Sequence, residues 1–122
     1  MDEHRRKEPG PDHPITLEDA GVRVVVHHQG RIIADSARAL ALAEASYPLA
    51  YYIPQADVMM DHLTASPTRT FCPYKGYARY FSSGDTNDVA WAYDEPYPAV
   101  AQIAGYVAFY VSKVDALDTE AL

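Results

Sequence analysis

Short apolar runs separated by turn residues dominate the chain and predict strands. Residues 22–28 and 31–35 are rich in Val and Ile and flank Gln29 and Gly30. β-Branched residues favour extended backbone, and glycine fits the positive φ that a two-residue turn needs, so the two runs predict a hairpin. Residues 49–53 form another short apolar run, which predicts a further strand.

Strict alternation marks the clearest strand in the sequence. Val89, Trp91 and Tyr93 alternate with Ala90 and Ala92. Because successive side chains of a strand point to opposite faces, this strand has one bulky face and one small face. The bulky face is expected to lie in the core or to line a pocket.

Residues 36–46 carry two competing patterns. Their Ala and Leu content favours a helix that begins at Ser36 as its N-cap, and a short helix is the prediction. The alternative is a strand, because Leu40, Leu42 and Glu44 line one face at a period of two.

The remaining pattern adds extended segments and few helical turns. A turn of helix is expected over residues 57–63, where Asp57 is placed to cap the first amides, and another within residues 96–104. Further extended segments are expected at residues 68–72, 77–82 and 105–114. Six or seven short strands with one to three short helices predict a mainly β (β-rich α+β) fold of bent sheets.

One domain over residues 15–122 is expected, because a chain of 122 residues buries one core. Residues 1–14 combine a charge cluster with several prolines and contain too little apolar surface to offset the entropy of ordering. We therefore expect a disordered N-terminal tail, and this tail includes His13.

Composition and charge narrow the function classes. The chain has 10 Lys and Arg against 17 Asp and Glu, a formal net charge of −7, which disfavours binding to nucleic acid or to an anionic membrane. No apolar run approaches the roughly 20 residues that span a bilayer, and the N-terminus lacks the apolar centre of a signal peptide, so a cytoplasmic protein is expected. One cysteine excludes an internal disulfide and a cysteine-based zinc site, and we expect no cofactor.

Cys72 and Lys75 lie three residues apart, and a nearby cation can activate a thiolate nucleophile. Such a nucleophile needs a base, and nothing in the sequence brings a histidine close to Cys72. A buried, unreactive cysteine is the favoured interpretation. Lys75 follows Tyr74, and its alternatives are to stack on rings, to bind an anion, to pair with a carboxylate such as Glu44, or to point into water.

Metal and phosphate chemistry receive little support. His27 and His28 are neighbours on a predicted strand, so their side chains point to opposite faces and do not share one ion. Asp57, Asp61 and His62 offer a cation site if they lie on a helix, but a capping aspartate and solvated charges are favoured. The sequence contains no Walker-type motif and no Gly-x-Gly-x-x-Gly.

A family resemblance rests on one ordered set of residues. Its most specific parts are the stretch Cys72-Pro73-Tyr74-Lys75-Gly76 and the later Trp91-x-Tyr93. The set also contains Ala34-Asp35-Ser36, Glu44, Tyr51-Tyr52-Ile53-Pro54, Asp57-Val58, Thr70, Ala78, Tyr80, Ala90, Pro96, Ile103 and Val107-Ala108-Phe109-Tyr110. Over about residues 22–114 the set resembles the bacterial and fungal domain-of-unknown-function family 427.

The resemblance implies a small domain similar to the β-tent architecture of the cereblon ligand-binding domain and the Mss4-like proteins, in which two bent antiparallel sheets pack at a steep angle. Those relatives often bind zinc through paired cysteines, which this chain lacks, so no structural zinc is carried over. The family's nucleotidyltransferase-like label finds a faint counterpart in Ser83, Gly84, Asp85 and Asp88, which a polar hairpin loop explains equally well.

The resemblance also implies a site. The family's recurrent polar and aromatic positions fall in this chain on Glu44, Tyr52, Thr70, Cys72, Lys75, Trp91 and Tyr93. These residue types are consistent with one pocket that has apolar walls and a few polar groups. We expect Trp91, Tyr93 and Tyr52 as walls, with Glu44 and Lys75 recognising a small polar or anionic ligand.

Two other function classes stay open. The chain is an enzyme if Cys72 is a nucleophile or if a nucleotidyltransferase-like site is present. It is a protein-interaction module if tyrosines gather on an exposed apolar face, since the chain has 10 of them. The sequence does not specify the oligomeric state or the ligand.

Overall fold

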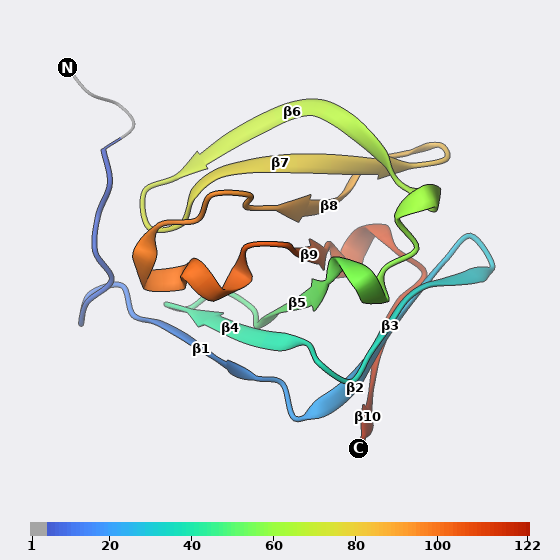
Figure 1. Cartoon of the computed structure of the whole chain (residues 1–122), viewed down its shortest axis with the longest axis horizontal. Helices are drawn as coiled ribbons and strands as arrows, with labels where there is room; N and C mark the ends of the chain where they lie inside the picture. The colour runs from blue at the N-terminus through green and yellow to red at the C-terminus, as the bar shows by residue number, and fades with distance from the viewer. Residues whose placement is uncertain (1–4) are drawn as a thin grey trace.

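The computed structural model describes residues 5–122, and within them it confirms a mainly β fold of two antiparallel sheets (Figure 1). The seven-stranded sheet has the order β1 (Ile15–Asp19), β4 (Leu40–Glu44), β5 (Ala50–Pro54), β9 (Tyr106–Phe109), β8 (Thr86–Ala92), β7 (Gly76–Ser83), β6 (Thr64–Cys72). The three-stranded sheet has the order β10 (Ala116–Ala121), β2 (Val22–His28), β3 (Arg31–Ser36). Short 3-10 helices lie between strands at η1 (Gln55–Asp57), η2 (Met60–His62), η3 (Pro98–Ile103) and η4 (Val111–Lys113).

The hairpin of β2 and β3 confirms the prediction from the valine-rich runs. Its turn residues Gln29 and Gly30 have φ angles of 53° and 80°, and His28 pairs with Arg31. Positive φ at both central residues is the type I′ geometry, whose twist matches that of the flanking strands. With β10 the hairpin forms the small sheet, whose strands run obliquely to those of the large sheet in Figure 1.

The predicted helix over residues 36–46 is wrong. Strand β4 occupies most of this range and lies between β1 and β5. Leu40, Leu42 and Glu44 are buried on one face, in the alternation that the sequence contains. Pairing of both edges of β4 with other strands outweighs the helix propensity of Ala and Leu.

Other local predictions are also corrected. Asp57 does not cap a helix, because its carboxylate accepts hydrogen bonds from Ser36 Oγ at 2.7 Å and from Arg38 Nη2 at 3.0 Å. The apolar run of residues 105–114 is a strand only as far as Phe109. Strands β1 and β10 were not predicted. Both are short, mostly exposed edge strands, so they carry few of the buried residues on which a pattern depends.

The two faces of the large sheet pack differently. The first, which we call the apolar face, carries Ile53, Phe81, Ala90, Val107 and Phe109. It packs against Val24, Val26 and other aliphatic residues of the small sheet in one core. The second, which we call the tyrosine face, carries Tyr52, Tyr80, Trp91, Tyr93 and Ala108. The predicted strand at residues 89–93 thus has its two bulkiest rings on the tyrosine face.

The segment of residues 5–14 contacts the domain at both of its ends. The Lys7 N–H donates to the Pro73 carbonyl at 2.8 Å, and the Ala45 N–H donates to the Pro14 carbonyl at 2.8 Å. Residues 1–4 of the predicted disordered tail lie outside the described residues. The mobility of residues 5–14 stays a prediction. Along the described part of the chain, no helix has the length and apolar character to cross a membrane.

Candidate functional site

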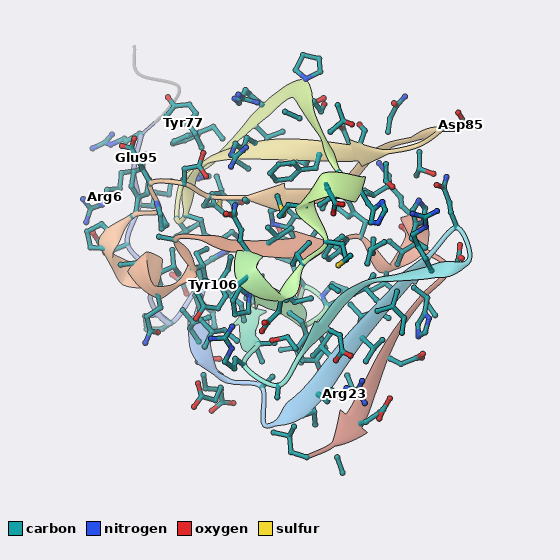
Figure 2. All side chains as sticks on the ribbon, turned by 45° about the vertical axis from the view of Figure 1, so that its right-hand side comes forward. Arg6, Arg23, Tyr77, Asp85, Glu95 and Tyr106 are labelled. Atoms are coloured by element: carbon teal, nitrogen blue, oxygen red, sulfur yellow. The ribbon has the colours of Figure 1, made fainter. Side chains whose placement is uncertain are left out.

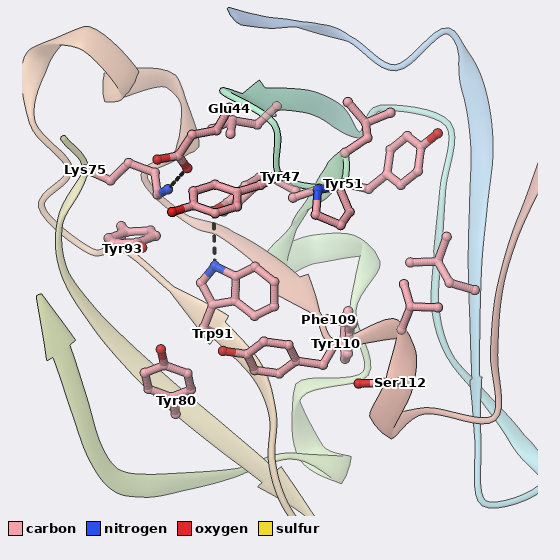
Figure 3. Close-up of a pocket in the computed structure, with 17 residues that line it drawn as sticks. Glu44, Tyr47, Tyr51, Lys75, Tyr80, Trp91, Tyr93, Phe109, Tyr110 and Ser112 are labelled. Atoms are coloured by element: carbon pink, nitrogen blue, oxygen red, sulfur yellow. Dashed lines mark hydrogen bonds and ion pairs between the residues drawn. The ribbon is translucent and has the colours of Figure 1, made fainter. Parts of the chain in front are cut away.

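A pocket of about 540 Å³ opens where β5 and β9 separate at one end of the large sheet (Figure 3). The last cross-strand pair of these strands on that side is Tyr52 with Ala108, and the chain then leaves β9 for η4. Of the 17 lining residues, eight carry aromatic rings. This size and these walls are typical of a site for a small molecule.

The register of four strands places one row of side chains across the pocket. Trp91 pairs with Tyr80 on one side and with Ala108 on the other, and Ala108 pairs with Tyr52. Paired residues share a face, so all four side chains point the same way. Because the Ala108 side chain is only a methyl group, Trp91 reaches across it, and Trp91 Nε1 donates a hydrogen bond of 3.0 Å to the Tyr52 hydroxyl.

Tyr110 extends this aromatic wall. Its ring centroid lies 4.4 Å from that of Trp91 and 6.5 Å from that of Tyr80, to which it is nearly parallel. The Tyr80 hydroxyl lies 2.8 Å from Thr70 Oγ1. Thr70 therefore orients a lining residue from β6 and does not itself line the pocket.

Lys75 and Glu44 form a buried ion pair at one end of the pocket. Lys75 Nζ donates to Glu44 Oε1, and the two residues are 8% and 6% exposed. Lys75 lies in the turn between β6 and β7, where Gly76 has a φ of 110°. Only glycine adopts this φ without strain, so Gly76 allows the turn that brings Lys75 next to the end of β4. Pairing with Glu44 was one of the alternatives stated for Lys75.

His13, which the sequence placed in a tail, completes this end of the site. Its Nε2 lies 2.7 Å from Glu44 Oε2, and its ring stacks on Tyr74 with centroids 3.9 Å apart. The contact with Glu44 spans 31 positions, so no local pattern indicates it. The one available signal was the alternation of Ile15 and Leu17, which extends the ordered domain to within two residues of His13.

Burial and hydrogen bonding fix the protonation of this end of the pocket. Burial opposes the charge on Glu44, but hydrogen bonds from Lys75 and His13 outweigh it and hold the pKa of Glu44 below its ordinary value. Burial raises the pKa of Tyr52 and of Tyr93 well above the ordinary tyrosine value. At neutral pH the carboxylate is therefore ionised and both hydroxyls are protonated.

The inventory of hydrogen-bonding groups at this end favours an acceptor on the ligand. Both oxygens of Glu44 are engaged, whereas the Lys75 ammonium has three N–H groups and uses one of them on Glu44. The Tyr52 oxygen accepts from Trp91, so its own O–H is left to donate. Within residues 5–122 the Tyr93 hydroxyl makes no hydrogen bond. The pocket thus contains hydrogen-bond donors that have no acceptor among the described residues.

The structure brings most of the predicted site residues together. Those that line the one pocket are Glu44, Tyr52, Lys75, Trp91 and Tyr93. Tyr80, Tyr110 and His13 also take part and were not among the predicted site residues. Figure 3 shows Lys75 and Glu44 at one end of the pocket, Trp91 near its centre and Ser112 toward the other end.

Cys72 and the residues around the turn between β7 and β8, Ser83, Gly84, Asp85 and Asp88, lie outside the pocket. Cys72 is partly buried against the tyrosine-face cluster, and no described residue makes a hydrogen bond to its Sγ. Asp88 accepts a hydrogen bond of 2.7 Å from Thr68 Oγ1, which ties the hairpin to β6. Figure 2 shows Asp85 at the far side of the molecule from Glu95, whose carbonyl lies next to Gly76. Nowhere in residues 5–122 do three or more His, Cys, Asp or Glu side chains form a group that could hold a metal ion.

A comparison with models of protein families supports the resemblance seen in the sequence. The model of the family described as Domain of unknown function (DUF427), which carries the label NTP_transf_9, matches residues 16–120. This match covers nearly the whole of both sheets and every residue of the pocket. Among curated proteins, none matches the chain.

Proposed function

We propose that this chain, which belongs to the family described as Domain of unknown function (DUF427), binds a small molecule in the pocket at the end of its large sheet. The ligand has a flat or apolar body and a polar or singly anionic head with an acceptor oxygen. One observation carries the proposal: the spare donors of Lys75, Tyr52 and Tyr93 lie at one end of a pocket with aromatic walls.

The walls favour a planar body. Trp91 and Tyr110 present ring surfaces to the pocket, and Phe109 and Leu42 add apolar surface. Ring contacts in offset or tilted geometry contribute about 0.5–1.5 kcal/mol beyond the burial of area. An aromatic or similarly flat ligand gains this contribution.

Charge limits the head group. Glu44 compensates the charge of Lys75, and the whole chain has a formal net charge of −7. A carbonyl or a single carboxylate is therefore accommodated better than a triphosphate, whose several charges would lack partners here. The same argument disfavours nucleotidyl transfer at this pocket. An enzyme that uses Cys72 is disfavoured because its Sγ has no hydrogen-bonded base in the described chain.

A protein-interaction module is the second candidate, and the rim of the pocket favours it. Tyr47, Leu49 and Val111 line the rim and are 62%, 49% and 62% exposed. A partner protein that inserts one side chain would cover these residues and use the same donors. The two candidates differ in whether a free small molecule binds.

The proposal also includes the arrangement of the two sheets and the location of the protein in the cell. The oblique course of the small sheet supports a β-tent-like arrangement of the two sheets. The single cysteine is consistent with a reducing compartment, which supports a cytoplasmic location.

The single tryptophan provides the test, because its indole N–H reports on the pocket directly. In ¹H–¹⁵N spectra, benzamide and benzoate are expected to shift the Trp91 indole signal in a saturable way. Toluene matches their ring but lacks the acceptor, and it is expected to bind at least about tenfold more weakly, since a hydrogen bond to a charged donor contributes about 1.5–3 kcal/mol.

A matched variant separates the head group from the walls. Glu44→Gln combined with Lys75→Met removes both charges and keeps the rings and the Tyr52 and Tyr93 hydroxyls, so the preference for benzamide over toluene is expected to fall to the smaller part that these hydroxyls contribute. If no probe moves the Trp91 signal of the wild-type protein, or if toluene binds as tightly as benzamide, the proposed ligand class is wrong.

A further inference from the structure

Glu44 joins two partners that come from distant parts of the chain. Its Oε1 accepts from Lys75, which faces the pocket, and its Oε2 lies 2.7 Å from His13 Nε2. The His13 side chain is 21% exposed and does not line the pocket. His13 therefore does not face the pocket. It contacts the Glu44 carboxylate, which compensates the charge of Lys75.

The ionised carboxylate fixes the tautomer of His13. A carboxylate only accepts hydrogen bonds, so the proton of a neutral His13 ring is on Nε2. Nδ1 makes no hydrogen bond to any described residue and is the atom that takes up the second proton. Protonation thus adds a charge at the site and leaves the bond to Glu44 in place.

The backbone holds His13 in either charge state. The His13 N–H donates to the Gly10 carbonyl at 2.9 Å, and the next residue, Pro14, accepts from the Ala45 N–H at 2.8 Å. The ring also stacks on Tyr74 with an interplanar angle of 3°. These contacts do not depend on the charge of the imidazole, so protonation changes the electrostatics of the site without releasing the segment.

Few charged groups face His13. Glu44 reaches it from β4, Tyr47 from the loop after β4, and Tyr74 from the turn that also carries Lys75. On its own segment, Lys7 and Asp12 are exposed to solvent. Glu44 and Lys75 are therefore the charged groups closest to the imidazole among the described residues. Their ion pair is neutral as a unit, and a protonated His13 gives the group of three a net positive charge.

We infer that His13 determines which charge of ligand the pocket prefers. This inference rests on the proposed function. With a neutral His13 the Lys75–Glu44 pair is compensated, and an uncharged acceptor fits. With a protonated His13 part of the Glu44 charge is directed to the imidazolium, Lys75 is less compensated, and an anionic head group gains affinity. Histidine changes charge between about pH 5 and pH 8, so the preference shifts within that range.

The test uses two probes of the same shape and different charge. Benzenesulfonate is anionic and benzenesulfonamide is uncharged at both about pH 5.5 and about pH 8. Followed by the Trp91 indole signal, the sulfonate is expected to bind the wild-type protein about tenfold more tightly at the lower pH, as expected for one added charge near the head group at an effective dielectric constant of about 20, after partial screening by solvent. The sulfonamide is expected to bind equally at both.

Two variants assign the effect to one residue. In His13→Gln the side-chain amide keeps a donor for Glu44 but does not titrate, so the sulfonate is expected to bind with about the same affinity at both pH values. His27→Gln is the matched control, because His27 lies on the small sheet beside Asp118 and is not a lining residue. It is expected to retain the full tenfold change.

Linkage gives a readout that needs no variant. If protonation of His13 strengthens sulfonate binding, sulfonate binding is accompanied by net uptake of protons from the buffer in the pH range in which histidine changes charge, and sulfonamide binding is not. A wild-type affinity for the sulfonate that does not change with pH, or a change that persists in His13→Gln, overturns this inference and leaves the proposed function standing. Failure of both probes to move the Trp91 signal at either pH overturns both.

Discussion

Tyr52 and Ile53 are neighbours on β5, yet they belong to parts of the molecule with different chemistry. Ile53 is fully buried on the apolar face, in a core cluster that consists of hydrophobic residues only. Tyr52 is 1% exposed on the tyrosine face, where it lies beside a pocket and close to the Lys75–Glu44 ion pair. One strand therefore contributes to a closed core on one side and to a partly open site on the other.

This difference shows that the stability of the fold explains the residues of the apolar face but not those of the tyrosine face. Burial of hydrocarbon stabilises a fold by about 25 cal/mol per Å², and the apolar face is built for that. A buried Lys–Glu pair is on average no more stabilising than a well-packed apolar pair, and atoms that line a pocket lose packing contacts. Stability alone therefore does not account for the Lys75–Glu44 pair and the pocket, which is consistent with the proposed binding site.

The largest effect on stability is expected when the ion pair is broken from one side. Lys75→Met leaves a buried Glu44 with only His13 as a partner and is expected to lower the free energy of unfolding by about 3–5 kcal/mol. Glu44→Gln combined with Lys75→Met removes both charges and is expected to recover most of that loss. Urea unfolding of the two variants measures the difference, and equal stabilities would contradict the ion-pair argument.

Truncation on the apolar face is expected to affect stability and not binding. Ile53→Ala removes fully buried methyl groups and is expected to cost about 2–5 kcal/mol of unfolding free energy. The fraction that remains folded is expected to bind benzamide within about twofold of the wild-type affinity, because the Ile53 side chain does not line the pocket. A folded Ile53→Ala protein that does not bind would show that the faces are not independent.

A larger side chain at Ala108, on the tyrosine face, is expected to abolish binding, whereas a similar change on the apolar face is not. Ala108→Val adds methyl groups between Trp91 and Tyr52, so it is expected to break their hydrogen bond, shift the unliganded Trp91 indole signal and abolish benzamide binding. Overpacking costs about 1–3 kcal/mol. Ala90→Val is the control, since Ala90 lies on the apolar face of the same strands, and it is expected to cost similar stability while binding persists.

The smallest change is expected from one hydroxyl. Tyr52→Phe removes the acceptor of the Trp91 indole and one donor to the ligand, and it is expected to cost about 0.5–1.5 kcal/mol of stability. Benzamide affinity is expected to fall by about threefold to tenfold, with toluene affinity unchanged. Isothermal titration of both probes measures this, and equal losses for benzamide and toluene would place the hydroxyl outside the recognition of the head group.

Patterns within one element predicted the parts of the fold that depend on local sequence. The valine runs and the Gln29–Gly30 turn predicted the β2–β3 hairpin, because turn geometry and β-branching act over a few residues. The alternation through Trp91 and Tyr93 predicted a bulky face in the core or in a pocket; both of these rings line the pocket, whereas Val89 lies in the apolar core. The family resemblance supplied Glu44 and Lys75, which local pattern alone does not connect.

Features that depend on distant partners were not predictable from pattern. The stretch at residues 36–46 is a strand because β1 and β5 pair with it, and its helix propensity is overridden. His13 was assigned to a tail because its neighbours are polar, although Glu44 and Tyr74 hold it in place. The sequence around Ala108 does not indicate its role, because that role depends on Tyr52 and Trp91, which strand pairing places on either side of it.

A crystal structure of the protein with benzoate tests the central claim most directly. A carboxylate oxygen of benzoate is expected within about 2.7–3.2 Å of Lys75 Nζ, with the benzoate ring against Trp91 and Tyr110. The Lys75–Glu44 pair is expected to remain in place. Benzoate bound only at another surface, or bound in the pocket with its carboxylate turned away from Lys75, would contradict the account.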